Sequence, residues 1–520
     1  VLSLPLLFMI GQDFFPYVDS GQMDLHVYPP QGMRPEDAEQ YFAAVEKEIR
    51  RVIPPDQIKL VLDNIGLPNG GINLAFTDSA VVSDSDGDIL ISLQPGKRNT
   101  ELYMRELRAD LHQKFPAATF FFPPANITNQ ILDFGLPAPI DLQVVGRGKN
   151  NYQIAQQLLK QVQAIPGVAD AHIHQQIALP TIDVNVDRMK SSQIGLTQQD
   201  VAQSMLISLT GTSQTAPNEW LNPQNGVNYQ VVVQTPTYRI DSLPSLGRTP
   251  ITSPKGDASQ LLSNVANFQR DATPVIINHY NIQPVYDIYA NTDQRDLGGV
   301  ASQVRKIMDA TEGNLPVGTT LALRGQVTTM TDSFLRLGIG IVFAIILVYL
   351  LMTVNFQSWV DPLIILMALP VAFAGVLWML FLTSTTFNVP SLMGAVMTIG
   401  VATANSILVV VFANDERAAG KTSMEAALNA GFTRLRPVCM TALAMIIGMM
   451  PMALALGEGG EQNAPLGRAV IGGLLLATLG TLFVVPVMYS WLRTAAPRNL
   501  DEEIDKAYHE GDQTQSTQQA

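Results

Sequence analysis

The chain has 520 residues, 47% of them hydrophobic and only 15% charged, whereas an average soluble protein has about 25% charged residues. A chain of this length forms several domains, and its acidic pI of about 4.9 argues against a basic nucleic-acid-binding face. A single cysteine, Cys439, excludes an internal disulfide.

The first eleven residues are largely apolar and precede a region with soluble-like composition. Ten helical residues rise only about 15 Å, half of the roughly 30 Å hydrocarbon core of a membrane. No basic leader or small-residue cleavage site of a signal peptide is present. We therefore expect residues 1–11 to be the end of a truncated transmembrane helix, with an earlier part of the polypeptide removed or encoded separately.

Residues 12–138 show strand and helix periodicities in the order βαββαβ, which is the ferredoxin-like split motif. The predicted elements are Met23–Tyr28, Arg34–Ile53, Ile58–Asn64, Asp88–Leu93, Thr100–Phe115 and Ala118–Phe122. Pro35 suits the first turn of its helix.

A second unit with the same order is predicted from two separated segments, residues 139–178 and 284–330. Its predicted elements are Ile140–Gly146, Tyr152–Ile165, Ala169–His174, Pro284–Ala290, Gly298–Ala310 and Thr320–Arg324. Between the two segments, residues 179–283 form an insert with its own strands and a helix near Gln198–Leu209. The fold class expected for the soluble part is therefore α+β, with two βαββαβ units and an inserted module.

Residues 331–495 contain runs of 24, 53, 21 and 24 residues without Asp, Glu, Lys or Arg. About 20 apolar residues cross a membrane as a helix, and the longest run is divided near Thr383–Pro390. This pattern predicts five full transmembrane helices, at Leu337–Asn355, Pro362–Leu382, Ser391–Asn414, Pro437–Leu456 and Ala469–Leu492.

Basic residues orient these spans. The loop of residues 415–436 carries Arg417, Lys421, Arg434 and Arg436, whereas the loop of residues 457–468 carries one arginine and two glutamates. We expect the first loop and the flexible tail, residues 496–520, to be cytoplasmic, and residues 12–330 to lie outside the inner membrane.

Several segments resemble the resistance-nodulation-division (RND) superfamily, most closely its hydrophobe/amphiphile branch. They are Gly11-Gln12-Asp13-Phe14-Phe15-Pro16, Phe356-Gln357-Ser358-Trp359, Gly400–Val409 and Arg434-Leu435-Arg436-Pro437 with Met440-Thr441. The resemblance covers about residues 1–495 and implies the C-terminal half of a proton-driven efflux antiporter. It also implies two porter subdomains, a docking insert, a homotrimer, a periplasmic adaptor and an outer-membrane channel, with no cofactor and no enzymatic activity.

In this family an aspartate pair from the first half is approached by a lysine, an arginine and a threonine from the second half. The resemblance implies Arg434 and Thr441 for two of these positions, but Ala404 occupies the lysine position. Without that cation the acidic pair loses a group that lowers its pKa. Asn405, Thr403 and Ser406 remain as hydrogen-bonding candidates for proton coupling, although small polar residues also serve close helix packing, and Arg434 could be a membrane-surface anchor.

Multidrug members line a deep pocket with phenylalanines near the second and third strands of the first porter unit. The matching stretch here, Leu67–Ala80, has one phenylalanine, so the resemblance implies Phe76, Leu67, Asn69 and the nearby Leu90 as substrate-pocket candidates. Phe120 and Phe122 share one strand face and are expected in the core.

Several alternatives stay open: a heavy-metal RND exporter, an RND-like lipid- or protein-export factor, or a non-transporting scaffold. Thirteen of the 20 methionines lie between Met330 and Met488, where apolar packing explains them. His172 and His174 are expected to be polar surface residues, and Asp84, Asp86 and Asp88 to form a solvated turn. No metal site is therefore expected, and Gly457–Gly460 lacks the Lys-Ser/Thr of a phosphate-binding loop.

Overall fold

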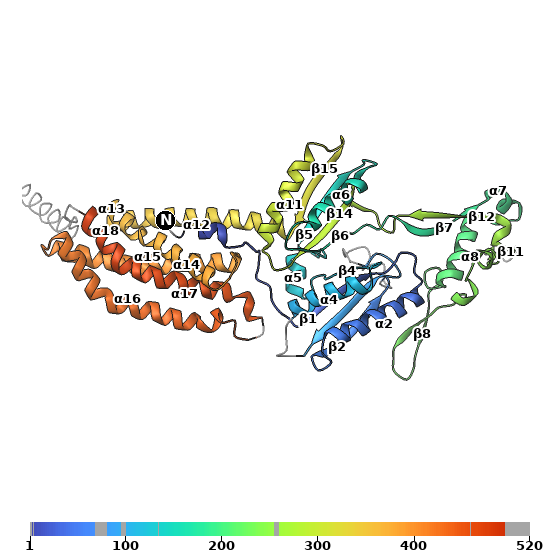
Figure 1. Ribbon diagram of the computed structural model, residues 1–520, viewed down its shortest axis with the longest axis horizontal. Helices are drawn as coiled ribbons and strands as arrows, with labels where there is room; N and C mark the ends of the chain where they lie inside the picture. Colours follow the sequence, from blue (N-terminus) through green and yellow to red (C-terminus); the bar gives the residue numbers. More distant parts are fainter. Residues whose placement is uncertain are drawn as a thin grey trace, which may run out of the picture. The chain divides into compact units, whose positions relative to one another are not determined.

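The computed structural model describes residues 3, 5–67, 81–94, 100–133, 135–253, 259–457 and 459–493. The chain divides into two compact units, one formed by residues 1–175 and 277–520 and the other by Gln176–Ile276. Figure 1 follows the elements in chain order.

The first sheet is built from β1 (Gln22–Tyr28), β2 (Ile58–Ile65), β3 (Gly87–Leu93) and β4 (Thr119–Phe121), with α2 (Pro35–Val52) and α4 (Thr100–Lys114) between them. Its antiparallel order is β2-β3-β1-β4, the order of a βαββαβ unit. Alternate residues such as Leu25 and Ile89 face the core, which also contains Phe42, Phe120 and Phe122. The opposite face carries His26, Asp88 and Leu90.

The second sheet joins β5 (Ile140–Gly146), β6 (Val168–Ile173), β14 (Gln283–Thr292) and β15 (Thr319–Gly325), with α6 (Asn151–Gln163) and α11 (Leu297–Glu312) as its helices. β14 pairs with β5 and β6, β5 pairs with β15, and the short β13 (Asn278–Tyr280) extends the edge. The core of this unit continues into Val327, Met330 and Val389 of two long helices. Packing therefore joins the second sheet directly to the helical part of the same unit.

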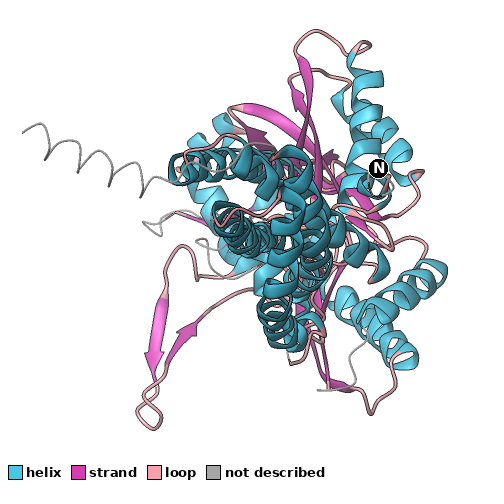
Figure 2. Cartoon of the chain, turned by 90° about the vertical axis from the view of Figure 1, so that its left-hand side faces the viewer, coloured by secondary structure: helices cyan, strands magenta, loops and turns pink. Residues whose placement is uncertain are grey.

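The separate unit contains a ribbon of β7 (Leu179–Val186) and β12 (Ala266–Thr273). Its other elements are α7 (Arg188–Gln193), α8 (Gln198–Thr210), β8 (Asn218–Leu221), β9 (Asn228–Val231), α9 (Leu243–Gly247), β10 (Pro250–Thr252), β11 (Ser259–Leu261) and α10 (Leu262–Val265). Thr197 and Asp200 form a capping box that starts α8. The β8–β9 hairpin has every strand residue exposed and is visible as a thin two-stranded ribbon in Figure 2.

Among the described residues, five helical segments are long and apolar enough to cross a membrane. They comprise α12 (Gln326–Phe356), α13 with α14 (Val360–Leu366 and Ala368–Leu382), α15 (Val389–Ala418), α16 (Ser423–Ala453), and α17 with α18 (Ala464–Leu479 and Val485–Leu492). A side chain on Gly472 would meet Met379 Cβ at 2.1 Å and the Gly375 oxygen at 2.6 Å. Close packing of α14 on α17 therefore requires glycine there.

These segments fit the five spans expected from sequence, but α12 and α16 begin well before Leu337 and Pro437. The charge-free runs mark only the apolar part of each helix. A capping box at Thr422 and Glu425 starts α16, and Pro437 lies within it. The short helix α1 (Leu6–Met9) precedes β1; its truncation and the boundaries of the expected domains stay predictions.

Candidate functional site

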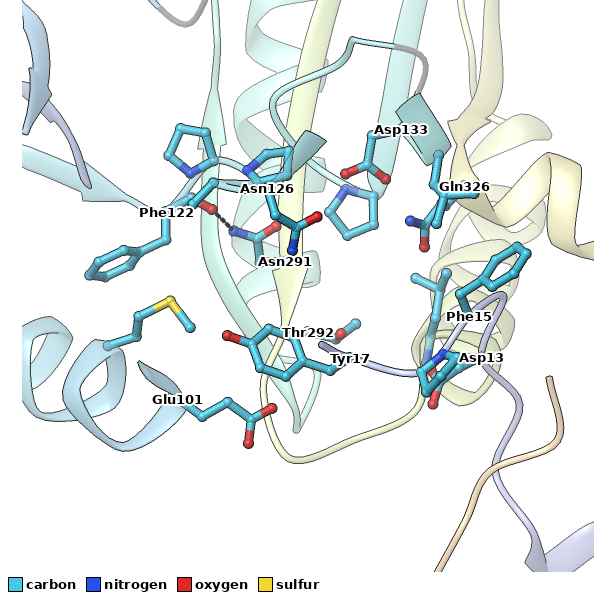
Figure 3. Close-up of a pocket in the computed structure, with 18 of the residues that line it drawn as sticks. Asp13, Phe15, Tyr17, Glu101, Phe122, Asn126, Asp133, Asn291, Thr292 and Gln326 are labelled. Carbon is cyan, nitrogen blue, oxygen red and sulfur yellow. Dashed lines mark hydrogen bonds between the residues drawn. The ribbon is translucent and has the colours of Figure 1, made fainter. Parts of the chain in front are cut away.

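A cavity of about 540 Å³ lies where the two βαββαβ units meet the beginning of α12. Its wall comes from the segment after α1, from α4, from the segment after β4, from the turn between β14 and α11, and from the loop before α15 (Figure 3). The lining combines carboxylates with aromatic and thioether groups, namely Asp13, Asp24, Glu101, Asp133, Asp296, Phe15, Tyr17, Phe122, Met23 and Met104. Such a surface can hold an amphiphilic molecule.

The Gly11-Gln12-Asp13 segment fixes one side of the cavity. Asp13 Oδ1 accepts a 2.7 Å hydrogen bond from the Leu297 amide, and the Asp13 amide donates to the Phe387 oxygen at 2.9 Å. Asp296 caps α11 through the Gly299 amide at 2.7 Å and also accepts from the Gln12 amide at 2.9 Å. The motif therefore ties the start of α11 to the loop before α15.

Asp133 follows α5 (Ile127–Leu132) and lies on the cavity wall near Gln326, the first residue of α12 (Figure 3). Its side chain is 2% exposed. Burial raises the pKa of Asp133 to about 8, with a smaller opposing effect of the Gln326 side chain. The Oδ1 atom has no hydrogen-bond partner among the described residues.

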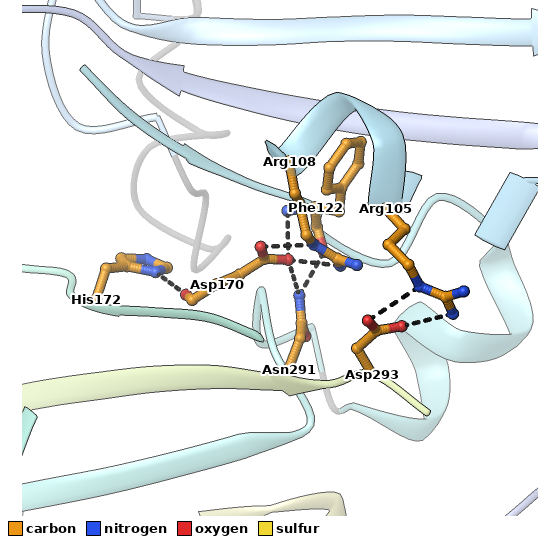
Figure 4. A network of polar contacts seen from close by, with 7 residues as sticks. All are labelled: Arg105, Arg108, Phe122, Asp170, His172, Asn291 and Asp293. Carbon is orange, nitrogen blue, oxygen red and sulfur yellow. Dashed lines mark hydrogen bonds and ion pairs between the residues drawn. The ribbon is translucent and has the colours of Figure 1, made fainter. Parts of the chain in front are cut away.

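At the cavity wall, a polar joint connects α4 of the first βαββαβ unit to β6 and β14 of the second (Figure 4). Arg108 donates two 2.8 Å hydrogen bonds to the carboxylate of Asp170. Asn291 donates to Asp170 at 3.1 Å and to the Phe122 oxygen at 2.8 Å. Asp170 is 3% exposed at its side chain and has a left-handed backbone with φ of 56°, so its conformation is held by this network.

A buried aromatic and histidine cluster lies beside the joint. The His172 ring stacks on Phe121 at 3.9 Å between centroids, and Phe121 lies 4.7 Å from the His26 ring. Burial lowers the pKa of His172 to about 4. Burial alone would also lower the pKa of His26, but the Asp86 carboxylate, 3.8 Å from Nε2, and the Asp88 carboxylate, hydrogen-bonded to Nδ1, raise it to about 8.

Two sequence expectations are wrong here. His172 and His174 are not surface residues, because the aromatic rings of Phe121 and Tyr289 pack against them. Asp84 is exposed as expected, but Asp86 is 1% exposed and accepts from the amides of residues 82 and 83 at 3.0 and 2.8 Å. Asp88 contacts His26 Nδ1 at 2.5 Å. Asp84 therefore faces water, whereas Asp86 and Asp88 lie beside the buried His26 imidazole.

The coupling candidates separate into two groups within the helical half-bundle. Thr403 and Ser406 are buried, where Thr403 donates to the Ile399 oxygen and Ser406 contacts Thr481 at 3.1 Å. In contrast, Ala404 and Thr441 are exposed and Asn405 is half-buried.

Arg434 is half-buried as well, and its guanidinium lies 5.3 Å from the ring centre of Phe412. Among the described residues, no hydrogen bond joins two of the five candidates: Thr403, Ser406 and Thr441 bond to residues 399, 481 and 438. Their role in proton coupling stays a prediction.

Of the expected substrate-pocket residues, the described Leu67 and Leu90 are not in the cavity lining. Leu67 and Leu90 are each 41% exposed, with Leu90 on the face of the first sheet opposite its helices. Asn69 and Phe76 lie outside the described residues. Their part in substrate binding stays a prediction, and the acidic lining with Asp133 was missed altogether. A lone aspartate in the apolar run of residues 131–138 was the available signal.

The family model described as the AcrB/AcrD/AcrF family matches residues 1–493. The chain belongs to this family of RND efflux transporters. Similar curated proteins include the cation efflux system protein CzcA of Alcaligenes sp. strain CT14, 26% identical over 499 residues. Protein HelA of Legionella pneumophila is 27% identical over 500 residues. Each alignment covers 94% of this chain and 46% of the relative.

Solved structures of a heavy metal efflux pump share the fold of this chain. A heavy metal efflux pump in crystal form II matches with a TM-score of 0.79 and 25% identity, covering 95% of this chain and 50% of that chain. The same kind of pump in crystal form I matches with a TM-score of 0.78. The chain thus spans about half the length of the RND proteins that it matches.

Proposed function

We propose that this chain is the C-terminal half of a proton-driven RND transporter that exports hydrophobic or amphiphilic compounds. The observation that carries this proposal is the cavity of about 540 Å³ with its mixture of carboxylate, aromatic and thioether groups. A cavity of this size and lining suits an organic molecule with an apolar body and a polar end. Its wall includes the first residue of α12, so an occupant would touch a membrane-spanning helix.

Energy for export is proposed to come from protons that bind an acidic pair in the other half of the transporter. Asn405 and Thr441 would approach that pair as a neutral hydrogen-bond relay, because neither is packed into the interior of this half-bundle. Thr403 and Ser406 would support the relay from the buried side of α15. The position of Arg434 over Phe412 suits a membrane-surface anchor better than a counter-charge.

Family membership supports a proposal for the assembly. We propose that residues 12–330 lie in the periplasm, that the two βαββαβ units act as porter subdomains, and that Gln176–Ile276 is the docking module. The complete transporter would be an inner-membrane homotrimer that delivers its substrate to a periplasmic adaptor and an outer-membrane channel.

A second candidate is the export of metal cations, favoured by the names of the relatives, which include two CzcA proteins and a heavy metal efflux pump. Among the described residues, no group of three or more His, Cys, Asp or Glu side chains is arranged to hold a metal ion. The two candidates predict different responses to a change in cavity volume.

The test compares the complete transporter with its Ala125→Trp variant in cells that lack other RND pumps. Ala125 lines the cavity, so an indole there should reduce export of a bulky fluorescent amphiphile several-fold. Lys149→Trp, at an exposed position, is the matched control and should export normally. Export of Zn²⁺ but of no amphiphile by the unmodified transporter would favour the metal candidate instead.

A further inference from the structure

The carboxylates around the cavity differ in what already binds them. Asp13 and Asp296 accept hydrogen bonds from the backbone amides of residues 297, 299 and 12, so they hold the wall together. Asp24 is half-buried, and its Oδ1 atom also lacks a hydrogen-bond partner among the described residues, although the His26 imidazole acts on the carboxylate electrostatically. Asp13 and Asp296 therefore have backbone partners, whereas Asp24 has only a nearby imidazole.

Asp133 is buried more completely than Asp24, and its carboxyl group is only partly satisfied by hydrogen bonds. Its side chain is 2% exposed, and its Oδ1 atom has no hydrogen-bond partner among the described residues. Figure 3 shows its carboxyl group at the cavity wall, on the side where Gln326 begins α12. A buried carboxyl oxygen without a donor is costly and marks a place where a ligand can supply one.

We propose that Asp133 is the residue that recognises the charged end of an organic cation, specifically the ammonium group of an amphiphilic amine. The apolar body of the amine would lie against the aromatic lining provided by Phe15 and Tyr17. This assignment rests on the proposed function and adds the charge of the substrate to it.

The two cations in the cavity lining do not compete for Asp133. Arg108 is held by the carboxylate of Asp170 through two hydrogen bonds of 2.8 Å, and Arg295 donates to the Pro166 oxygen at 2.7 Å. An incoming ammonium would therefore be the cation that Asp133 meets.

The protonation state of the Asp133 carboxyl group decides whether a proton is released when the amine binds. Burial raises its pKa to about 8, so the group is mostly neutral below that pH. When the ammonium binds, the Asp133 O–H bond breaks, its proton leaves to water, and the carboxylate and ammonium form an ion pair. Binding of the amine is therefore expected to strengthen as pH rises from 6 to 8. The other titratable groups on this wall are Asp13, Tyr17, Asp24, Glu101, Arg108, Arg295 and Asp296.

The experiment measures transport by the complete transporter with two dansyl probes of similar bulk, the amine dansylcadaverine and the neutral dansylamide. Asp133→Asn should raise the KM for the amine about tenfold, the factor that ~1.4 kcal/mol corresponds to. Its KM for dansylamide should stay within about twofold, which also shows that the variant folds. Asp309→Asn, an exposed aspartate on α11, is the control and should leave both values unchanged.

The pH dependence provides the second readout. In the unmodified transporter the KM for the amine should fall between pH 6 and pH 8, and this fall should be clearly smaller in Asp133→Asn, where Asp24, whose pKa burial raises to about 7, still titrates. Equal loss of both probes, or unchanged kinetics for the amine, would overturn the role of Asp133 while leaving the proposed function intact. Transport of neither probe by the unmodified protein would overturn the proposed function and this assignment together.

Discussion

Removal of the Arg108 side chain should loosen the joint between the two βαββαβ units. Arg108 is 18% exposed and Asp170 only 3% exposed at the side chain, so Arg108→Ala leaves a buried carboxylate with the weaker donors of residues 122 and 291. Loss of one partner of a buried pair costs about 3–5 kcal/mol. Local opening of β6 should therefore become easier by that amount.

A neighbouring ion pair provides the matched control. Arg105 and Asp293 are 39% and 30% exposed, and pairs of this kind are typically worth about 0–1 kcal/mol. Arg105→Ala thus removes a bidentate arginine from the same helix without leaving a buried charge. The contrast isolates burial of the partner as the cause of the difference.

Hydrogen exchange of the complete transporter is the appropriate assay, because a protein with several units has no single free energy of unfolding. Amides of β6 should exchange roughly 150- to 5,000-fold faster in Arg108→Ala, as 3–5 kcal/mol implies, and less than about sixfold faster in Arg105→Ala. Equal acceleration in the two variants would show that burial of Asp170 is not what makes the loss of its arginine costly. No acceleration in either would show that the joint does not limit opening.

Three further predictions concern coupling, assembly and pH. Asn405→Leu should abolish export at neutral pH while Arg434→Gln leaves much of it; the reverse ranking, at equal expression, would make Arg434 the coupling cation. Deletion of residues 212–226 should weaken trimer formation in cross-linking assays without affecting membrane insertion, and unchanged cross-linking would contradict a role in assembly. Because burial lowers the pKa of His172 to about 4 from about 6.5 in the unfolded chain, stability should fall as the pH drops from 6.5 towards 4. His172→Phe should reduce this fall, as measured by the protection of β6 amides from hydrogen exchange at pH 5 and pH 7.

Much of the architecture could be predicted from local pattern. Alternation of apolar residues located β5, whose observed bounds match Ile140–Gly146, and the charge-free runs located the apolar helices. The burial of His172 could not be predicted in this way. Alternation assigns a histidine to the face away from the helices, but it does not reveal that Phe121 of the other sheet covers that face.

The cavity was harder to predict because its wall joins distant segments. Asp13 and Leu297 are 284 residues apart in sequence and share a hydrogen bond, which no local periodicity encodes. Family resemblance directed attention to Leu67 and Leu90, outside the cavity lining. Asp133 carried a weak signal, a single acid within an apolar run, but only its burial beside the start of α12 gives that acid a chemical role.

The proposed division of roles is that this chain supplies the substrate cavity while the other half of the transporter supplies the proton-binding groups. Its most direct test is transport by purified protein in liposomes with an imposed proton gradient, comparing the complete transporter with this chain alone. We expect gradient-dependent export of an amphiphilic amine by the complete transporter and none by the isolated chain. Proton-dependent export by the isolated chain would contradict it.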